Sequence, residues 1–524
     1  MDLEAEDKQQ AGRVRALADS CRATWPDGAV RIIETHISRV LLAGRYAYKF
    51  KRPLNLGFVD YSTLERRQYF CDEELRLNRR TAPDLYLERV SVAETTEGLA
   101  FGATPAVEFA VKMLRFSEDE LMSRMHTHGR LQPEHIDALA RSIAAFHLSL
   151  TGTTAYGDAE SVLAPMEENF WQIRQFSAEP PTELNKLEQW TDAHYRQHRA
   201  LLGERHQGGF IRECHGDLHL NNIVFHNGRP QAFDGIEFNP QLRFIDTVSE
   251  IAFLTMDLFD RNAGSLAWRF LNRYLEWTGD FVGLRLLRFY QVYRAIVRAK
   301  VAAIRLSQIA HDRQSRSELD SYLALACRFT EKSRPFLLLT CGLSGSGKTT
   351  LSQPLIERLG AVRVRSDVER KRLFDLAPDA NSASTLDSGI YTPEATRRTY
   401  DRLESIADQL LTGGTPALVD ATFLKREERD RFALLAQRHA VPFLILQCQA
   451  PESVLRERVA RRHAEDSDAS EADLTVLVQQ LAHARKPAPE EPVITIDTSQ
   501  PLVTSRIIEQ VKSGLGMTDR QADT

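Results

Sequence analysis

The pattern of apolar and polar residues changes in character along the 524-residue chain. Residues 37–51 read as two short strands that meet at Ala43-Gly44, and the second of them alternates residue by residue. Apolar runs at 85–92 and 106–113 predict further strands, whereas residues 136–147 carry apolar side chains at helical spacing. The order predicts a small β-rich part followed by a larger helical part.

Local signals place helix starts and one domain boundary. Ser62-Thr-Leu-Glu65 has the spacing of a capping box, which predicts a helix that begins after Ser62 and runs to Arg80. Residues 281–323 keep helical spacing, and the polar stretch 328–335 ends in proline just before an apolar run. We therefore expect a first domain at residues 1–334 and a second at residues 335–524.

The second domain alternates strand-like and helical segments. Its strand-like runs are residues 336–341, 361–364, 416–419, 443–447 and 493–496. Strands that alternate with helices form parallel sheets with helices on both faces, so the pattern predicts a doubly wound α/β domain. No internal repeat links the two halves, which indicates two unrelated folds.

Composition narrows the setting in which the protein works. Lys plus Arg number 67 and Asp plus Glu 72, so the net charge of −5 gives no general reason to bind nucleic acid or an anionic membrane, although a local basic groove stays open. Six cysteines without C-x-x-C pairs favour reduced, mostly buried thiols. An acidic start and the lack of about 20 consecutive apolar residues predict a cytoplasmic protein without a membrane span. The oligomeric state has no signal in the sequence.

Residues 342–349 read Gly-Leu-Ser-Gly-Ser-Gly-Lys-Thr, the G-x-x-x-x-G-K-[ST] phosphate-binding loop, directly behind an apolar run. Glycines let backbone N–H groups surround a triphosphate, the lysine reaches the outer phosphates, and the final hydroxyl holds Mg²⁺. We therefore expect ATP and Mg²⁺ as cofactors. The expected nucleotide-binding residues are Gly342, Ser344, Gly345, Ser346, Gly347, Lys348, Thr349 and Thr350.

Three later segments supply candidates for the chemistry at this loop. Asp367, at the end of a strand expected beside the phosphate-binding strand, is the candidate general base, and Arg370 is the candidate anchor for the acceptor; a helix cap is the plainer reading of Asp367. Asp420 ends another strand and suits a metal-binding carboxylate. Arg456, Arg458, Arg461 and Arg462 gather on one helical stretch. Of these, Arg458 and Arg462 are expected to contact the nucleotide from a lid, and a surface helix is the alternative.

A second constellation lies upstream, in His215-Gly-Asp-Leu-His-Leu-Asn-Asn222. Phosphoryl transfer needs a carboxylate that orients the attacking hydroxyl, an amide oxygen on the metal and a further carboxylate on the metal. The spacing from Asp217 to Asn222 equals that of the kinase catalytic loop, and Asp234 follows on a strand-like segment. We expect Asp217 to be the catalytic base and Asn222 and Asp234 to bind the metal.

These upstream residues resemble the aminoglycoside phosphotransferase and choline kinase branch of the protein-kinase-like fold, over about residues 30–330. The resemblance implies a bilobal α+β domain in which Lys49 pairs with the phosphates and Glu74 with that lysine. Lys51 and Glu73 fit those two roles equally well by position. No kinase-type G-x-G-x-x-G loop is present, and residues 34–38 are expected to do its work.

The downstream order of motifs resembles the small P-loop kinases, a group that contains gluconate kinase, zeta toxins and polynucleotide kinases. The D-x-x-R spacing from Asp367 to Arg370 is closest to the last two, and the segment does not resemble the mechanical ATPases of the AAA class. Together the halves resemble bacterial proteins described as bifunctional aminoglycoside phosphotransferase and ATP-binding proteins. That family name describes a fold and leaves the substrate open.

Three functions fit these motifs. The first is a two-site ATP-dependent kinase that transfers the γ-phosphoryl group to a hydroxyl of a small molecule or a nucleic-acid end. The second is a nucleotide-responsive regulator in which one domain gates the other. The third, a polynucleotide 5′-hydroxyl kinase, draws on the local basic cluster of Arg363, Arg365, Arg370, Lys371 and Arg372. Aminoglycoside resistance is disfavoured, because a polycationic substrate needs an acidic pocket and the helical segments 160–176 and 183–205 mix charges.

Overall fold

The structure is a computed structural model that describes residues 2–25, 30–57, 59–177, 181–309, 312–382, 389–465 and 472–517, without the side chains of residues 24 and 462–465. The chain forms two compact units. One consists of Met1–Glu168 and Tyr195–Asp257, and the other of Asn169–His194 and Leu258–Thr524. The second unit thus includes chain that precedes residue 335, and the boundary between residues 334 and 335 stays a prediction.

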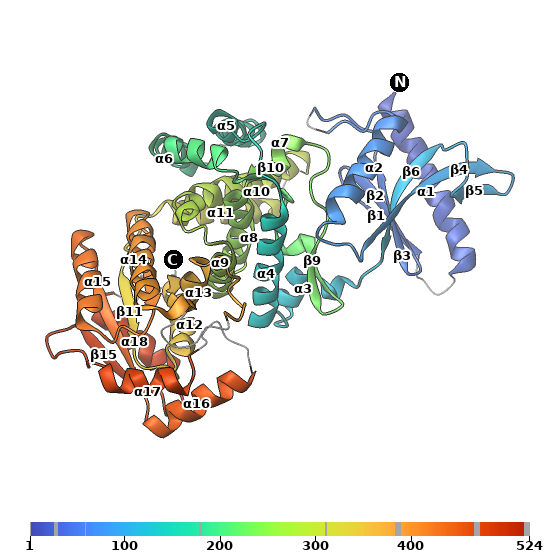
Figure 1. The fold of residues 1–524 in the computed structure, drawn as a ribbon. Coiled ribbons are helices and arrows are strands. Elements are labelled where there is room, and N and C mark those ends of the chain that lie inside the picture. The colour runs from blue at the N-terminus through green and yellow to red at the C-terminus, as the bar shows by residue number, and fades with distance from the viewer. Residues whose placement is uncertain are drawn as a thin grey trace. The chain divides into compact units, whose positions relative to one another are not determined.

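The first unit contains a six-stranded antiparallel sheet in the order β1-β2-β3-β6-β4-β5. Its strands are β1 (Val30–Glu34), β2 (Ser38–Ala43), β3 (Tyr46–Lys51), β4 (Tyr86–Thr95), β5 (Gly98–Phe101) and β6 (Glu108–Leu114), which are the blue arrows of Figure 1. The expected hairpin at Ala43-Gly44 is confirmed, with Val40 opposite Lys49 in the β2–β3 register. Gly44 adopts a positive φ of 57°, which allows the tight reversal.

Helix α1 (Leu3–Thr24) packs on one face of this sheet and α2 (Leu64–Asn78) on the other. Leu41 and Phe50 join the core beneath α1, whereas Ala47 and Val111 join the core beneath α2. Because side chains alternate between the faces of a strand, the residues of β3 that share a face with Ala47 also face α2. This alternation brings both strand lysines to α2.

The start of α2 differs from the capping-box prediction. Thr63, rather than Ser62, is the N-cap residue, and its side chain accepts a hydrogen bond from the N–H of Arg66. The reason is that Asp60 engages Ser62, whose backbone N–H donates to the Asp60 carboxylate at 3.0 Å. The prediction was therefore wrong by one residue, and the helix ends at Asn78 rather than Arg80.

Short strands and helices complete the first unit and carry the catalytic-loop motif. They are α3 (Met122–Thr127), α4 (Pro133–Ser149), β7 (Ile211–Glu213), β8 (Ile223–His226), β9 (Arg229–Ala232), α7 (Pro240–Arg243) and β10 (Phe244–Asp246). Strand β7 pairs with β10 and β8 with β9, both antiparallel. Three helices continue from one unit into the other: α5 (Ala159–Phe176), α6 (Glu183–Gln207) and α8 (Thr247–Asp260).

The second unit contains a five-stranded sheet in the order β12-β13-β11-β14-β15, and every pair in it is parallel. Its strands are β11 (Leu337–Cys341), β12 (Val362–Arg365), β13 (Ala417–Asp420), β14 (Phe443–Gln449) and β15 (Val493–Asp497). The helices that follow the strands are α12 (Lys348–Leu359), α13 (Ser366–Arg372), α14 (Pro393–Thr412), α15 (Arg426–Arg438), α16 (Glu452–Glu465), α17 (Leu474–His483) and α18 (Thr504–Gly514). Helices α12 and α18 pack on one core of the sheet, and α14 contacts β12 and β13. The expected doubly wound parallel fold is confirmed.

The strand order corrects one expectation. Strand β12, which leads to Asp367, is not beside the phosphate-binding strand β11, because β13 lies between them. Strand β13 therefore brings Asp420 next to the loop, and Asp367 follows a strand at the edge of the sheet.

Helices α9 (Gly264–Thr278), α10 (Leu287–Gln308) and α11 (Arg313–Thr330) precede the sheet in the second unit. Helix α9 contacts both α12 and β12. Gly360 allows this close approach, because a Cβ there would lie 3.0 Å from the Trp268 indole nitrogen. Asn272 on α9 accepts from the N–H of Arg363 at 2.6 Å and donates to the carbonyl of Ala361 at 2.9 Å. Among the described residues, no helix is long and apolar enough to cross a membrane.

Candidate functional sites

In the first unit, one buried carboxylate receives both lysines of β3. The Lys49 ammonium donates to Glu74 Oε1 at 2.9 Å and also contacts Asp234. Lys51 donates to the other oxygen of Glu74 and to Glu237. The structure thus brings Glu74, rather than Glu73, to the lysines, and it brings both lysines to the same partner.

The electrostatics of this cluster follow from burial and close pairing. Burial alone would lower the pKa of Lys49, but the carboxylates of Asp234 and Glu74 raise it well above its usual value. Burial would likewise raise the pKa of Glu74, and the two lysines instead hold it below its usual value. Lys49 and Glu74 are therefore charged at neutral pH, and Lys49 keeps the positive charge that a phosphate contact requires.

The sequence alone did not single out Glu237 and Tyr61, which form the deeper part of the cluster with Lys51. Lys51, Glu237 and Tyr61 are buried together, with the Tyr61 hydroxyl donating to Glu237. Burial and the Glu237 charge raise the pKa of Tyr61, so its hydroxyl stays protonated as a donor. The sequence does contain a signal for these residues. A second lysine, Lys51, follows Lys49 by two residues, and a second carboxylate, Glu237, follows Asp234 by three.

The loop that carries Asp217 is held by hydrogen bonds to its own backbone. The Asn222 side-chain NH₂ donates to the carbonyl of Asp217 at 3.0 Å and to its carboxylate at 2.9 Å. Glu250 accepts from the N–H groups of His215 at 2.6 Å and Gly216 at 2.9 Å. Gly216 has a φ of 86°, and a Cβ there would lie 2.8 Å from the carbonyl of Leu242. This bracing fixes the carboxylate of Asp217 relative to Asn222.

Asp234 lies at a special backbone position beside the lysine cluster. Its φ of 62° falls in the left-handed region, which is uncommon for a residue with a side chain. The N–H of Asp234 donates to the Tyr86 hydroxyl at 3.1 Å, and the next N–H, of Gly235, donates to Asn78 at 2.8 Å. Strain of this kind persists where the surroundings hold it and is concentrated at functional sites.

Residues 34–38, expected to replace a glycine-rich loop, form the turn between β1 and β2. The Thr35 hydroxyl accepts from the N–H of Ser38 at 2.9 Å and lies 2.8 Å from the Ser38 hydroxyl. A contact of this turn with phosphate stays a prediction.

A buried His147, Cys214 and Glu250 group lies behind the catalytic loop, with side-chain ligand atoms within 4.8 Å of one another. Both carboxylate oxygens of Glu250 already accept from backbone N–H groups of that loop. Burial lowers the pKa of His147 to about 3, helped by the nearby Arg212 charge. Burial raises the pKa of Cys214 well above its usual value, so the thiol stays protonated. We interpret the group as part of the support of the loop.

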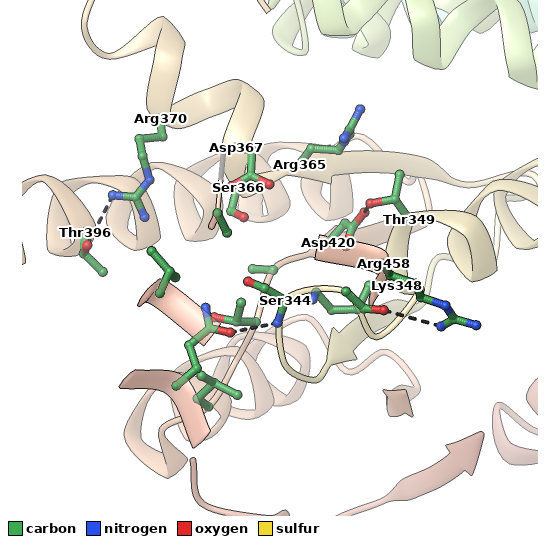
Figure 2. Close-up of a pocket in the computed structure, with 18 of the residues that line it drawn as sticks. Ser344, Lys348, Thr349, Arg365, Ser366, Asp367, Arg370, Thr396, Asp420 and Arg458 are labelled. Carbon is green, nitrogen blue, oxygen red and sulfur yellow. Dashed lines mark hydrogen bonds between the residues drawn. The ribbon is translucent and has the colours of Figure 1, made fainter. Parts of the chain in front are cut away.

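In the second unit, a cavity of about 880 Å³ opens over the phosphate-binding loop. The expected site residues that line it are Ser344, Gly345, Gly347, Lys348, Thr349, Thr350, Asp367, Arg370, Asp420 and Arg458. Figure 2 shows Lys348, Thr349 and Asp420 close together on neighbouring elements. The structure thus brings together residues that are spread over more than a hundred positions of the sequence.

The loop geometry depends on glycine and on one carboxylate. Gly342 has a φ of 149°, and a Cβ there would lie 2.6 Å from both the Cys448 carbonyl and the Ser346 hydroxyl. Lys348 donates to the carbonyls of Gly342 at 3.1 Å and Leu343 at 2.9 Å. These hydrogen bonds hold the Lys348 side chain folded back over the loop.

Asp420 receives two hydroxyl groups, one on each carboxylate oxygen. Thr349 donates to Oδ2 at 2.9 Å, and Thr340 donates to Oδ1 at 3.0 Å. A threonine hydroxyl beside a carboxylate forms the set of hard oxygen donors that suits Mg²⁺. The residues present therefore fit a magnesium ion, which Thr349 and Asp420 would hold.

The acceptor-side candidates lie on α13. Asp367 lines the cavity in the first turn of this helix, whose N-cap position is Arg365 rather than Asp367. Arg370 is buried and donates to the Ile390 carbonyl at 3.0 Å and to the Thr396 hydroxyl at 3.2 Å, as Figure 2 shows for Thr396. The guanidinium is thereby held in a fixed orientation at the cavity wall.

The lid arginines differ from one another. Arg458 donates to the Thr498 carbonyl at 2.6 Å and to the Gly345 carbonyl at 3.4 Å, so it lies against the loop. Arg461 lines the cavity, whereas Arg456 pairs with Glu452 on the same helix. The side chain of Arg462 is outside the described residues. Nucleotide contacts by Arg458 and Arg462 stay predictions.

The local basic cluster is not the exposed groove that nucleic-acid binding requires. Its members Arg363, Arg365, Arg370 and Lys371 are all buried. The fifth, Arg372, donates to backbone carbonyls at the end of α9, including that of Glu276 at 2.7 Å. Only Arg365 and Arg370 of the five line the described cavity.

Several cavity residues had no sequence signal, because distant helices supply them. Gln480 on α17 accepts from the loop N–H of Ser344 at 2.7 Å. On α15, Glu428 lines the cavity, and burial raises its pKa. The Tyr400 hydroxyl lies 3.4 Å from that of Thr422 and accepts from the N–H of Phe423 at 3.3 Å. No fixed spacing along the chain links these residues to the loop.

Comparison with known proteins identifies the class of each part. Residues 90–235 match the phosphotransferase enzyme family, and residues 337–487 match the AAA domain family. The second description carries the AAA name, but it does not make the segment one of the mechanical ATPases, which its sequence does not resemble. The chain combines a phosphotransferase segment with a P-loop segment and is a kinase.

Curated relatives match most of the chain, and solved structures match smaller shares of it. Uncharacterized proteins of Mycobacterium tuberculosis and Mycobacterium bovis are 29% identical over 446 residues, which is 84% of this chain and 88% of the relative. A sugar kinase from Janibacter is 22% identical and covers 36% of this chain and 98% of its own, with a TM-score of 0.29. A choline/ethanolamine kinase family protein from Mesorhizobium loti is 11% identical and covers 60% of this chain and 94% of its own, with a TM-score of 0.39.

Replacing Glu74 with Gln should damage the upstream site far more than replacing Glu73. The amide cannot accept from Lys49 and Lys51 on both sides, so two buried cations lose their shared partner, at a cost of about 3–5 kcal/mol. Glu73 instead pairs with the half-exposed Arg76 and lies 3.6 Å from Arg243, so a smaller loss of about 1 kcal/mol is expected. Urea unfolding of both variants measures this difference, and equal losses would contradict the assignment of Glu74.

Acidification should destabilise the protein through His147. Its pKa is about 3 in the folded chain and about 6.5 when unfolded, so only the unfolded state takes up this proton between those values. The free energy of unfolding should therefore fall as pH drops below 6.5, by about 2 kcal/mol at pH 5. In His147→Gln the fall from pH 7.5 to pH 5, measured by urea titration, should be smaller by that amount. An identical fall in both proteins would exclude the effect.

Proposed function

We propose that the protein is an ATP-dependent phosphotransferase with a nucleotide site in each unit, and that each site transfers the γ-phosphoryl group to a hydroxyl of a small molecule. The observation that carries the proposal is the cavity of about 880 Å³ that gathers Lys348, Thr349, Asp420 and Asp367. Phosphoryl transfer depends on positioning and charge stabilisation, and these four side chains supply the required groups.

At the downstream site, the loop N–H groups and Lys348 bind the phosphates. Thr349 and Asp420 would hold Mg²⁺, which neutralises charge on the phosphate oxygens when it is bound. Asp367 accepts the proton of the acceptor hydroxyl, and Arg370, fixed by Thr396, anchors the acceptor. Asp367 and the loop residues line the same cavity, which would hold the acceptor between them.

At the upstream site, Lys49 pairs with the phosphates while Glu74 orients it. Asp217 orients and deprotonates the acceptor hydroxyl, and Asn222 holds that carboxylate through its NH₂ group. The amide oxygen of Asn222 and the carboxylate of Asp234 are oxygen donors that suit Mg²⁺. A different residue is present for the base, for the metal ligands and for the phosphate-binding lysine. This complete set favours catalysis over a domain that only binds nucleotide.

The other readings have less support from the described residues. A polynucleotide kinase would need an exposed basic groove, and four of the five clustered cations are buried. Transfer of a labelled phosphoryl group from ATP to a 5′-hydroxyl oligonucleotide at low salt would show that the acceptor is a nucleic-acid end rather than a small molecule. Aminoglycoside resistance stays disfavoured by the mixed charges near Glu160 and Glu188, which pair with Arg199 and Arg174. If the protein were a regulator in which one unit controls the activity of the other, the site that contains Asp217 would bind ATP without releasing phosphate.

Two substitutions separate the sites. Lys348→Ala removes the loop cation, so a fluorescent ATP analogue that shows two binding events with the wild type should show one. Asp217→Asn keeps the shape of the upstream site, so both binding events should remain while transfer at that site falls about 10²–10⁴-fold. ADP release over a panel of hydroxyl compounds measures the transfer. A single binding event in the wild type would mean that one of the two sites does not bind nucleotide.

Asp367 provides the matching test in the second unit. Asp367→Asn should lower turnover at the downstream site about 10²–10⁴-fold with nucleotide affinity unchanged, because only the proton acceptor is lost. Asp375→Asn, a change of the same kind shortly after α13, serves as the control. Unchanged turnover in Asp367→Asn would leave Asp367 as a structural residue and remove it from the mechanism.

A further inference from the structure

We infer that Glu276 of helix α9 is a positioning residue of the P-loop site, acting through Arg363 on the first turn of the phosphate-binding helix. Glu276 lies well before the P-loop in the sequence, within the region expected to form the first domain. The inference deepens the proposed function and rests on it for the presence of nucleotide at this loop. Helix α9, which precedes the first strand of the parallel sheet in the chain, would then contribute to the downstream site.

The first step is the contact between α9 and strand β12. Glu276 Oε1 lies 3.0 Å from the Arg363 guanidinium and 3.8 Å from that of Arg365, and Oε2 lies 2.7 Å from Arg273. The side chains of Arg363 and Glu276 are only 1% and 9% exposed. Burial raises the pKa of Glu276, but its arginine partners lower it to about 2, so the carboxylate is charged.

Arg363 in turn contacts α12, the helix that follows the phosphate-binding loop. Its guanidinium donates to the Ser352 hydroxyl at 3.1 Å and to the Thr349 carbonyl at 3.4 Å, both on α12. Thr349 is the residue whose hydroxyl contacts Asp420. Burial lowers the pKa of Arg363, and the carboxylate of Glu276, which lies 3.0 Å from the guanidinium, opposes this shift.

Arg365 lies at the edge of the cavity and also contacts Glu276. Arg365 ends β12 one residue before α13, the helix that carries Asp367. In Figure 2 the Arg365 guanidinium points away from Ser344 and Lys348. Its contact with Glu276 therefore holds the end of β12 from outside the loop. Asn272, one turn earlier on α9, fixes the same strand through the backbone of Arg363.

A second ion pair between the same parts of the molecule offers a matched control. Arg269 of α9 lies 2.9 Å from Glu357 of α12, and both side chains are mostly buried. Glu357→Gln removes a carboxylate between α9 and α12, as Glu276→Gln removes one between α9 and β12. Glu357 is near the end of α12, about two helical turns after Thr349, and it does not line the cavity described above.

The experiment measures the affinity of the full chain for magnesium-ATP in the wild type, Glu276→Gln, Glu276→Asp, Glu357→Gln and Lys348→Ala. The binding event lost in Lys348→Ala identifies the P-loop site. At that site we expect Glu276→Gln to weaken binding at least tenfold, Glu357→Gln to stay within twofold, and Glu276→Asp to recover most of the loss. Circular dichroism and a cooperative melting curve confirm that each variant is folded.

The outcomes are distinguishable. If Lys348→Ala loses no binding event, the proposed nucleotide site fails and the inference fails with it. If Lys348→Ala loses the event but Glu276→Gln and Glu357→Gln bind equally well, the site stands and the inference is overturned. Should Glu276→Gln not fold, the double variant Glu276→Gln/Arg363→Gln, which removes both charges of the buried Glu276–Arg363 pair, takes its place. Wild-type affinity in that folded double variant would also overturn the inference.

Discussion

Two buried carboxylates, Glu74 and Glu276, each hold two or more basic side chains at the border of a site. A carboxylate has two oxygens and can accept from cations on two sides, which makes it suited to join a strand to a helix. Taking these charges out of water is costly, and close pairing offsets that cost only when every partner is in place. The position of Lys49 in one unit and of Arg363 in the other depends on this balance.

Buried charge also changes how the composition should be interpreted. A run of arginines near residues 363–372 suggests a basic surface in the sequence, yet these side chains serve mostly as internal connections to Glu276, to Glu369 and to helix carbonyls. Charges that are neutralised inside the fold contribute little to attraction of a distant polyanion. The small net charge of the chain therefore describes its outer field better than the local cluster does.

Much of the fold could be predicted, because short-range patterns determine it. The glycine-rich loop, the strands of the parallel sheet and the spacing of Asp217 and Asn222 depend on neighbours within a few residues. The order of the strands could not be predicted, since it is decided by contacts between distant segments, and Asp367 was therefore not expected on a helix that follows an edge strand. Gln480, Tyr400 and Glu276 were missed for the same reason. Ser62 was misjudged as a helix cap because Asp60, two residues earlier, competes for it.

Strand β12 is an edge of its sheet. On the side of β12 that pairs with no other strand, Asn272 of α9 donates to the carbonyl of Ala361 and accepts from the N–H of Arg363. These are the bonds that a further strand would make, so the side chain occupies a place where another polypeptide could otherwise pair. Uncovered edge strands promote self-association. A fragment that begins at residue 335 would lack α9 and present this edge to solvent. Its tendency to aggregate would then reflect the missing helix and would say little about the intrinsic folding of the P-loop sheet.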